Sequence, residues 1–271
     1  MPATRELAAP VPEAARLAGG DLDFGSSAAK AIAVLDSFRG AGAVLGVTEI
    51  AARTGLSKST AHRLLAVLVE RRFVQRHDNR YMLGRALFEL GALVPDCRPR
   101  SLREAAVPLM TDLYASTRAT INLAVLEGAE VLYVEKLYGA GSVATPARVG
   151  GRMPALCTGV GKALVAFSPP DVIAEHLARP VRRLTPHTVV HRGLLSEQLA
   201  KAKETGVAHD HEESQLGIRC IAVPILRPGT SEPMGALSVT MRATENVKSQ
   251  VVNELRWASN QIAATCRSHG L

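Results

Sequence analysis

The stretch LGVTEIAARTGLSKSTAHRLLAVLVERRFV, residues 45–74, decides the fold of the N-terminal part of this 271-residue chain. Two short helical segments meet within it at Gly55, because glycine readily takes the left-handed backbone conformation that ends a helix. Ser57 can then cap the second helix through its hydroxyl oxygen. The apolar face of that helix follows the i, i+3, i+4, i+7 spacing and consists of Ala61, Leu64, Leu65 and Leu68. Two helices joined by so short a turn are typical of a helix-turn-helix.

The flanking residues extend this pattern on both sides. Ser27 is expected to cap a preceding helix that ends before Gly40. On the other side, FVQRHDNRYML, residues 73–83, predicts two short strands with a turn at Asp78 and Asn79, residue types that tolerate positive φ. Three helices and a hairpin make a winged helix-turn-helix, which we place at residues 26–84. Residues 1–25 are rich in Ala, Pro and Gly and predict a mobile tail.

The net charge of +7 is concentrated in the same part of the chain. Between Thr48 and Arg85 there are eight basic residues and three acidic ones, as expected for a surface that binds a polyanion. In a helix-turn-helix the second helix enters the major groove with its first residues near the base edges. The candidate DNA-binding residues are therefore Lys58, Ser59, Thr60, His62 and Arg63 on that helix, Arg72 at its exit, and Arg76 and Arg80 in the hairpin.

These residues suit different parts of a duplex. The Arg63 guanidinium can bond two acceptors on guanine, whereas Arg72 suits phosphate oxygens. A solvated basic hairpin, or a winged helix used for protein contact, is the alternative interpretation. The order of the helices, the short turn and the local charge together favour DNA.

The remainder of the chain follows a different pattern. Pro95 and Pro99 mark a hinge, so we expect a linker helix at residues 85–101 and a second domain at residues 102–271. That domain contains a first helix at residues 102–116, strands at 121–126, 131–138, 220–226 and 236–241, and a closing helix at 246–267. Because the strands come in adjacent pairs with helices between and around them, the pattern predicts an α+β fold with an antiparallel sheet.

The segment PALCTGVGKALVAF, residues 154–167, has the glycines and lysine of a phosphate-binding loop. However, Gly161 and Lys162 put Leu156 where the motif requires its first glycine and Ala163 where it requires a hydroxyl. We therefore reject nucleotide hydrolysis. Cys157 to Gly159 instead lie at the start of a predicted helix, where free backbone N–H groups and the helix dipole favour a carboxylate.

Taken together, the chain resembles the IclR (isocitrate lyase regulator) family of bacterial transcription factors from about residue 26 to its end. The N-terminal match is the stretch quoted first with the YMLG strand, residues 81–84. The C-terminal match is GRMPALCTGVGKALVAF, residues 151–167, and GVAHDHEESQLGIRCIAVPI, residues 206–225. The resemblance implies a winged helix, a linker helix and an effector-binding domain of GAF-like fold. It also implies homodimers or homotetramers on partly palindromic operators.

The resemblance further implies an effector site in the second domain. It places Gly159, Val160, Asp210, Cys220, Ser238 and Thr240 at the effector, and we add Cys157 and Leu156 from the same turn. Family members often have His at the position of Leu156, so a more apolar wall is expected here. A pocket role and a structural role both stay open for Glu213. For Lys162 the simplest expectation is a solvated side chain in the first turn of the helix.

Two histidine-containing segments and one cysteine offer metal-binding and enzymatic alternatives. HDHEE, residues 209–213, and HTVVH, residues 187–191, carry metal-ligating residue types. In the first segment, strand alternation would place these side chains on two different faces. In the second, the β-branched Thr and Val residues disfavour the helix in which histidines at i and i+4 would share a face. Cys157 at a helix start is expected to have a lowered pKa and to be a possible nucleophile. An enzyme with an appended DNA-binding domain is thus the alternative of a different class. The four cysteines include no CxxC pair, which argues for reduced, mostly buried thiols.

These observations predict a cytoplasmic, ligand-responsive DNA-binding regulator without catalytic residues, cofactor or metal. The expected partners are a double-stranded DNA operator, a small organic or aromatic acid, and further copies of the chain. The chain has no uninterrupted apolar run of about 18 residues, so no membrane partner is expected. Repression is the favoured sign of regulation, and activation is the alternative.

Overall fold

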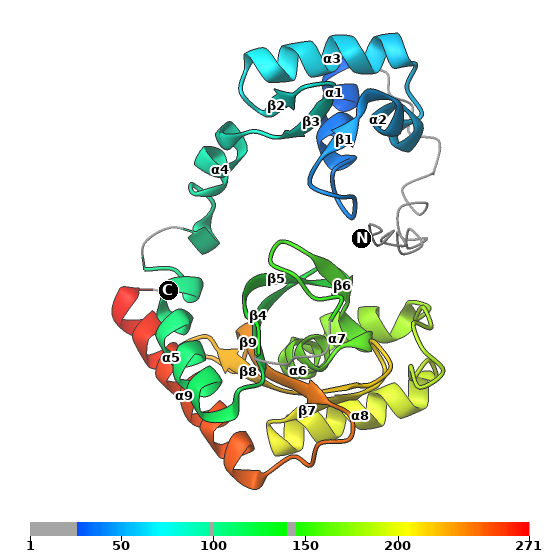
Figure 1. Ribbon diagram of the computed structural model, residues 1–271. Coiled ribbons are helices and arrows are strands. Elements are labelled where there is room, and N and C mark those ends of the chain that lie inside the picture. The colour runs from blue at the N-terminus through cyan, green and yellow to red at the C-terminus, as the bar shows by residue number, and fades with distance from the viewer. Residues whose placement is uncertain (1–25, 98–99, 140–144, 271) are drawn as a thin grey trace, which may run out of the picture. The chain divides into compact units, whose positions relative to one another are not determined.

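The computed structural model describes residues 26–97, 100–139 and 145–270 (Figure 1). The chain divides into two compact units, one ending at Val94 and the other beginning at Pro95. The expected tail, residues 1–25, lies outside the described residues. The expected linker, residues 85–101, spans this division, and its helical part is seven residues long.

The N-terminal unit has the helices and strands that the winged-helix pattern predicts. Its elements are α1 (Ser27–Asp36), β1 (Leu45–Gly46), α2 (Val47–Thr54), α3 (Lys58–Glu70), β2 (Val74–His77), β3 (Arg80–Leu83) and α4 (Arg85–Gly91). Gly55 ends α2 with φ 69°, and Asp78 has φ 53° in the turn between β2 and β3. One prediction is off by a residue, because Ser26 and not Ser27 caps α1 by accepting from the Ala29 N–H.

Helices α1, α2 and α3 of this unit enclose a small apolar core. The predicted stripe of α3 faces inward, with Ala61, Leu65 and Leu68 buried and Leu64 packed against them. Val34 from α1 and Ile50 from α2 complete the centre of the core. This packing leaves the opposite face of α3 exposed to solvent, which is the face that carries its polar residues.

The C-terminal unit is an antiparallel sheet with helices on both faces, as expected for an α+β fold. Its strands are β4 (Thr120–Glu127), β5 (Glu130–Leu137), β6 (Arg152–Pro154), β7 (Ala208–His211), β8 (Ile218–Leu226) and β9 (Pro233–Arg242), in the spatial order β6-β5-β4-β9-β8-β7. Its helices are α5 (Leu102–Thr117), α6 (Gly159–Phe167), α7 (Pro170–Ala178), α8 (Arg192–Thr205) and α9 (Ser249–His269), with short 3-10 turns at Pro95–Cys97 and Ala155–Cys157.

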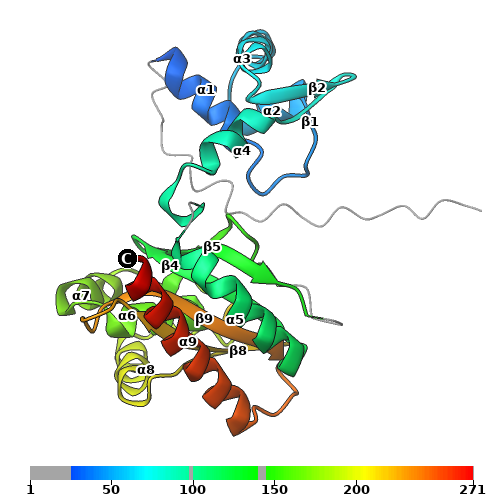
Figure 2. The same ribbon diagram turned by 90° about the vertical axis from the view of Figure 1, so that its left-hand side faces the viewer.

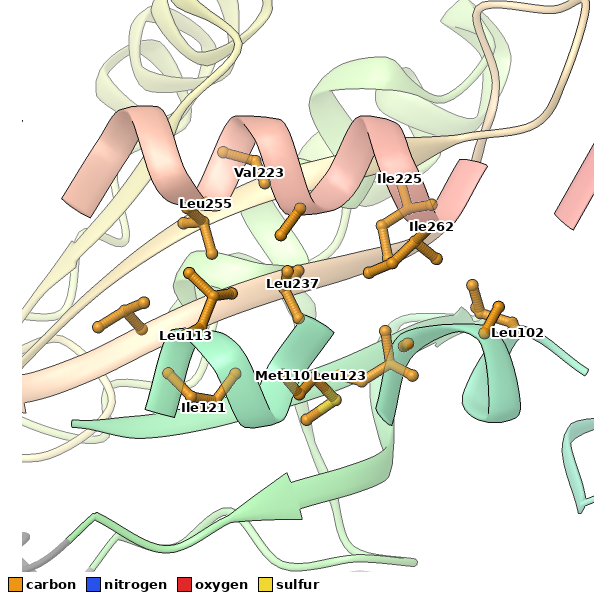
Figure 3. Close-up of a cluster of buried hydrophobic side chains, with 14 of the residues drawn as sticks. Leu102, Met110, Leu113, Ile121, Leu123, Val223, Ile225, Leu237, Leu255 and Ile262 are labelled. Carbon is orange, nitrogen blue, oxygen red and sulfur yellow. The ribbon is translucent and has the colours of Figure 1, made fainter. Parts of the chain in front are cut away.

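The helices α5 and α9 lie side by side on one face of this sheet (Figures 1 and 2). Figure 3 shows how their apolar side chains meet those of the strands, with Leu255 and Ile262 of α9 and Leu113 of α5 around Leu237 of β9. All four of these side chains are buried. The long closing helix therefore secures the C-terminal end of the chain to the sheet.

Helix α6 packs on the opposite face of the sheet. The strand residues that point to this face alternate along each strand with those that point to α5 and α9. Close approach is possible because the strands present small side chains there, namely Ala124 of β4, Ala208 of β7, Ala222 of β8 and Ala236 of β9. Every residue of α6 from Gly159 to Ala166 is buried. The polar residues expected at an effector belong to this face as well.

Candidate functional sites

The exposed start of α3 is the first candidate site. Ser57 caps the helix by accepting from the Thr60 N–H at 3.2 Å, and its hydroxyl donates to Thr60 Oγ1 at 2.9 Å. Ser59 Oγ lies 3.1 Å from Ser57 Oγ, so these hydroxyls form one cluster at the helix start. The side chains of Lys58, His62 and Arg63 are exposed on the same helix. Among the described residues, no carboxylate pairs with Lys58 or Arg63, and both charges face solvent.

The arginines of the hairpin are arranged differently from those of α3. Arg80 donates to the Val44 carbonyl at 2.9 Å and forms an ion pair with Glu49 at 3.2 Å. Arg76 donates to the Asp78 carbonyl at 2.8 Å and to Asn79 Oδ1, within its own turn. Both guanidinium groups therefore shape the hairpin. At the start of α3, by contrast, Lys58 and Arg63 form no ion pair with a carboxylate among the described residues.

Arg72 lies just beyond the end of α3 and adopts a left-handed backbone conformation with φ 65°. Its Nη2 is 3.8 Å from Glu89 Oε1, and both side chains are largely exposed. An exposed ion pair of this length is weak, since solvent screens it. The Arg72 cation is therefore only loosely held.

The second candidate site is the sheet face under α6. The strand register places Asp210, Cys220 and Thr240 side by side across β7, β8 and β9. The next row along the strands contains Ala222, Ser238 and Asn122. All the polar residues of these two rows are buried. The tertiary structure thus brings together Asp210, Cys220, Ser238 and Thr240, which come from three separate strands.

Asp210 is held by the turn that follows β7. Its Oδ1 accepts from the backbone N–H of Glu213 at 2.8 Å, and its Oδ2 accepts from Ser214 Oγ at 2.5 Å. Burial raises the pKa of the Asp210 carboxyl, and the hydrogen bonds from Ser214 and Glu213 act in the opposite direction. The carboxyl group is therefore positioned rigidly on a nearly dry sheet face.

Asn122 belongs to the same face, although the sequence did not point to it. Its Nδ2 donates to Ser238 Oγ and to Thr240 Oγ1, each at 3.2 Å. The side-chain carbonyl of Asn122 has no hydrogen-bond partner among the described residues. Only its position in an alternating strand, two residues before Ala124, signalled that it shares the face.

Tyr133 is a second residue of this region that sequence reasoning missed. It lies on β5 among the apolar residues that pack against α6. Burial raises the pKa of its phenol, and the nearby Cys220 and Asp210 raise it further. Tyr133 is therefore neutral and offers a hydroxyl near the effector face.

The expectation of a solvated Lys162 is wrong. The residue is 1% exposed, and its Nζ lies 2.5 Å from Glu213 Oε1 in a buried ion pair. The reason is that the first turn of α6 faces the turn after β7, which the sequence places far away. Glu213 is held further by Thr188, whose hydroxyl donates to the Glu213 carbonyl at 2.7 Å, and by the Val189 N–H. Glu213 thus links α6, β7 and the 185–189 segment.

The glycines at the start of α6 allow close approach. A Cβ atom on Gly161 would lie 2.0 Å from the Ala155 carbonyl oxygen, which is impossible without moving the backbone. A Cβ atom on Gly159 would lie 3.1 Å from Cys220 Sγ. Within the described part of the chain, the backbone N–H groups of Gly159 and Val160 have no acceptor. They are the first free donors of a helix whose start lies against Cys220.

The expected lowering of the Cys157 pKa is also wrong. Burial raises the pKa of this thiol to about 12, and the nearby Lys162 only partly offsets that effect. Burial likewise raises the pKa of the Cys220 thiol to about 11. Both groups are therefore protonated thiols at neutral pH. Leu156, expected in an apolar wall, is buried beside Ala155 and Val160.

The two histidine-containing segments do not converge on one point. On β7, Asp210 faces inward while His209 and His211 face outward, as strand alternation requires. The segment at residues 187–191 is not helical, and its contacts with Glu213 run through the Thr188 hydroxyl and the Val189 N–H. No set of three metal-ligating side chains comes together within residues 26–97, 100–139 and 145–270. No helix of these same residues is long and apolar enough to span a bilayer.

Comparisons with known proteins agree with this architecture. The family described as the IclR helix-turn-helix domain matches residues 27–78, and the family described as bacterial transcriptional regulator IclR C-terminal matches residues 98–264. The transcriptional regulator KdgR of Dickeya chrysanthemi is 32% identical over 248 residues, which cover 89% of this chain and 80% of that protein. XynR of Escherichia coli is 34% identical over 202 residues, covering 73% of this chain and 79% of that one.

Solved structures extend the similarity to three dimensions. An IclR homolog from Microbacterium hydrocarbonoxydans, complexed with 4-hydroxybenzoate, superimposes with a TM-score of 0.82 at 31% identity and covers 90% of this chain and 100% of that one. The Thermotoga maritima IclR gives a TM-score of 0.73 at 29% identity, covering 89% and 98%. With a matching DNA-binding domain and effector domain in the same order, this chain belongs to the IclR family of bacterial transcriptional regulators.

Proposed function

We propose that this regulator represses transcription and that a small organic or aromatic acid, bound on the sheet face under α6, changes its affinity for DNA. The observation that carries the proposal is the pair of N–H groups of Gly159 and Val160, which have no acceptor among the described residues and lie at a helix start where Gly159 packs against Cys220. Free donors at a helix start favour an anion. The similar Microbacterium protein complexed with 4-hydroxybenzoate supports the aromatic member of this class.

In this proposal the polar row supplies the remaining contacts. Asp210, Cys220, Ser238 and Thr240 offer a carboxyl, a thiol and two hydroxyls on an otherwise apolar face that Leu156 and Cys157 extend. A buried site of this kind binds a ligand by shape and orients it by a few polar groups. The high pKa of the Cys157 thiol supports binding over nucleophilic catalysis, and therefore a regulator without enzymatic activity.

On the DNA side, we place Lys58, Ser59, Thr60, His62 and Arg63 in the major groove, with Arg72 at the phosphates and Arg76 and Arg80 shaping the wing. A dimer or tetramer places two such helices in successive major grooves, about 34–36 Å apart. An effector that binds the DNA-competent and incompetent states with different affinity shifts their populations. The protein is expected to act in the cytoplasm, where its operator is.

The test is an electrophoretic mobility shift on DNA upstream of the protein's own gene, with and without 4-hydroxybenzoate, benzoate, pyruvate or succinate. We expect at least one acid to change the apparent Kd for DNA. The same acid should raise the Tm of the wild-type protein and not that of an Asp210→Ala, Cys220→Ala variant. Equal stabilisation of both proteins would refute this site. Stronger DNA binding with the acid, together with increased reporter expression, would refute repression in favour of activation.

A further inference from the structure

Asn122 carries a buried hydrogen-bonding group that the protein leaves unused. The residue is 3% exposed, and its side-chain carbonyl oxygen has no partner within the described residues. Leaving such an acceptor buried and unsatisfied disfavours the folded state. Native proteins therefore keep one where water, an ion or a ligand satisfies it.

Within the described residues, none of the neighbours of Asn122 on this face donates a hydrogen bond to its carbonyl oxygen. Ser238 and Thr240 are both engaged with the amide nitrogen of Asn122. Lys136, directly opposite Asn122 on β5, directs its ammonium to Thr145 Oγ1 and to the Ala147 carbonyl, each at 2.6 Å. Thr120, two residues earlier on β4, accepts from the Gly139 N–H at 3.2 Å. The amide carbonyl is thus the one group of this set that still lacks a partner.

The position of this carbonyl connects it to the proposed effector site. Asn122 is the register partner of Ser238, and Ser238 lies two residues from Thr240 in the row of Cys220 and Asp210. From these contacts we infer that Asn122 is a specificity-determining residue, which selects an effector carrying a hydroxyl group in addition to its carboxylate. This inference rests on the proposed effector site. It adds the class of ligand, a hydroxy acid.

A hydroxyl fits this place for a chemical reason. Its O–H donates to the Asn122 carbonyl, and its oxygen can accept from a neighbouring Ser238 or Thr240 hydroxyl. An acid without the hydroxyl would leave the carbonyl unsatisfied and displace any water that reached it. Sites built to bond a hydroxyl discriminate strongly against the analogue that lacks it.

The experiment compares matched pairs of acids that differ by one hydroxyl, using calorimetric titration of the full-length protein. The pairs are 4-hydroxybenzoate with benzoate, malate with succinate, and lactate with propionate. We expect at least one hydroxy acid to bind about tenfold or more tightly than its partner. Equal affinities within every pair that binds would overturn the inference while leaving the effector site standing. If none of the six acids binds, both the inference and the acid class in the proposed function fail.

Variants of Asn122 separate its role from general packing. Asn122→Leu keeps the side-chain size and removes the carbonyl, so the preference for the hydroxy acid should fall to about one while the hydroxyl-free acid still binds. Asn122→Ala serves as the second variant if the leucine does not fold, as judged by circular dichroism. Thr120→Val, on the same strand and face, is the matched control and should keep the wild-type preference. A preference that survives both Asn122 variants means that another group binds the hydroxyl, and overturns the inference.

Discussion

Lys162 Nζ lies 2.5 Å from Glu213 Oε1, and the two side chains are 2% and 5% exposed. This ion pair joins the first turn of α6 to the turn after β7. The backbone N–H of the same Glu213 donates to Asp210 Oδ1, so the pair also fixes the carboxyl group of the proposed effector site. A lysine that resembles part of a phosphate loop is instead a structural element of the sheet face.

Lys162→Met should destabilise the C-terminal unit by about 3–5 kcal/mol, because it leaves the Glu213 carboxylate buried without its partner. The double variant Lys162→Met, Glu213→Gln should recover most of this loss, since no uncompensated charge is left. Trp257, the single tryptophan, lies on α9 of this unit, so its fluorescence in urea reports the unfolding. A double variant no more stable than Lys162→Met would contradict the ion-pair explanation.

The two glycines of α6 should respond differently to alanine. Gly161→Ala drives a Cβ atom against the Ala155 carbonyl and should cost about 1–3 kcal/mol of stability. The Cβ atom of Gly159→Ala meets Cys220, with Sγ nearest at 3.1 Å, so the fold should persist while the space beside the free N–H groups shrinks. We therefore expect Gly159→Ala to melt near the wild-type temperature but to lose its response to acids in the mobility shift. A normal response would mean that the acid binds elsewhere.

Arg63→Ala should weaken binding to the specific operator by about 1–3 kcal/mol and leave binding to a scrambled duplex nearly unchanged. Arg72→Ala should weaken binding to both duplexes about equally, because a phosphate contact carries no sequence information. Titrating both variants against both duplexes at one salt concentration distinguishes the two roles. Equal losses on the two duplexes for Arg63→Ala would remove it from base recognition.

Alkylation by iodoacetamide at pH 8 should modify Cys97 rapidly and Cys157 and Cys220 slowly. Cys97 is exposed, whereas the other two thiols are buried and have pKa values of about 12 and 11. At pH 8 their thiolate fractions are about one in ten thousand and about one in a thousand. Mass spectrometry of the native and urea-unfolded protein provides the measurement. Rapid labelling of native Cys157 would show a thiolate and would revive the nucleophile hypothesis.

Much of this protein was determined by local sequence patterns. The Gly55 turn, the Ser57 cap and the α3 stripe depend on residues a few positions apart, so backbone preference and apolar spacing were sufficient to predict the winged helix. The antiparallel sheet followed from paired strands. The alternation in β9 placed Ser238 and Thr240 on one face, but the register of the neighbouring strands was needed to bring Asp210 and Cys220 beside them.

Only the tertiary structure decided the states of the charged and polar side chains. Lys162 lies 51 residues from Glu213, and Asn122 lies 116 residues from Ser238, so no local pattern reveals that these residues touch. The Cys157 pKa was predicted in the wrong direction because a helix start was considered without its burial, and desolvation is the largest effect on this pKa. Spacing along the chain specifies which face a residue occupies. Its partner and its exposure to water depend on which distant strands and helices pack against that face.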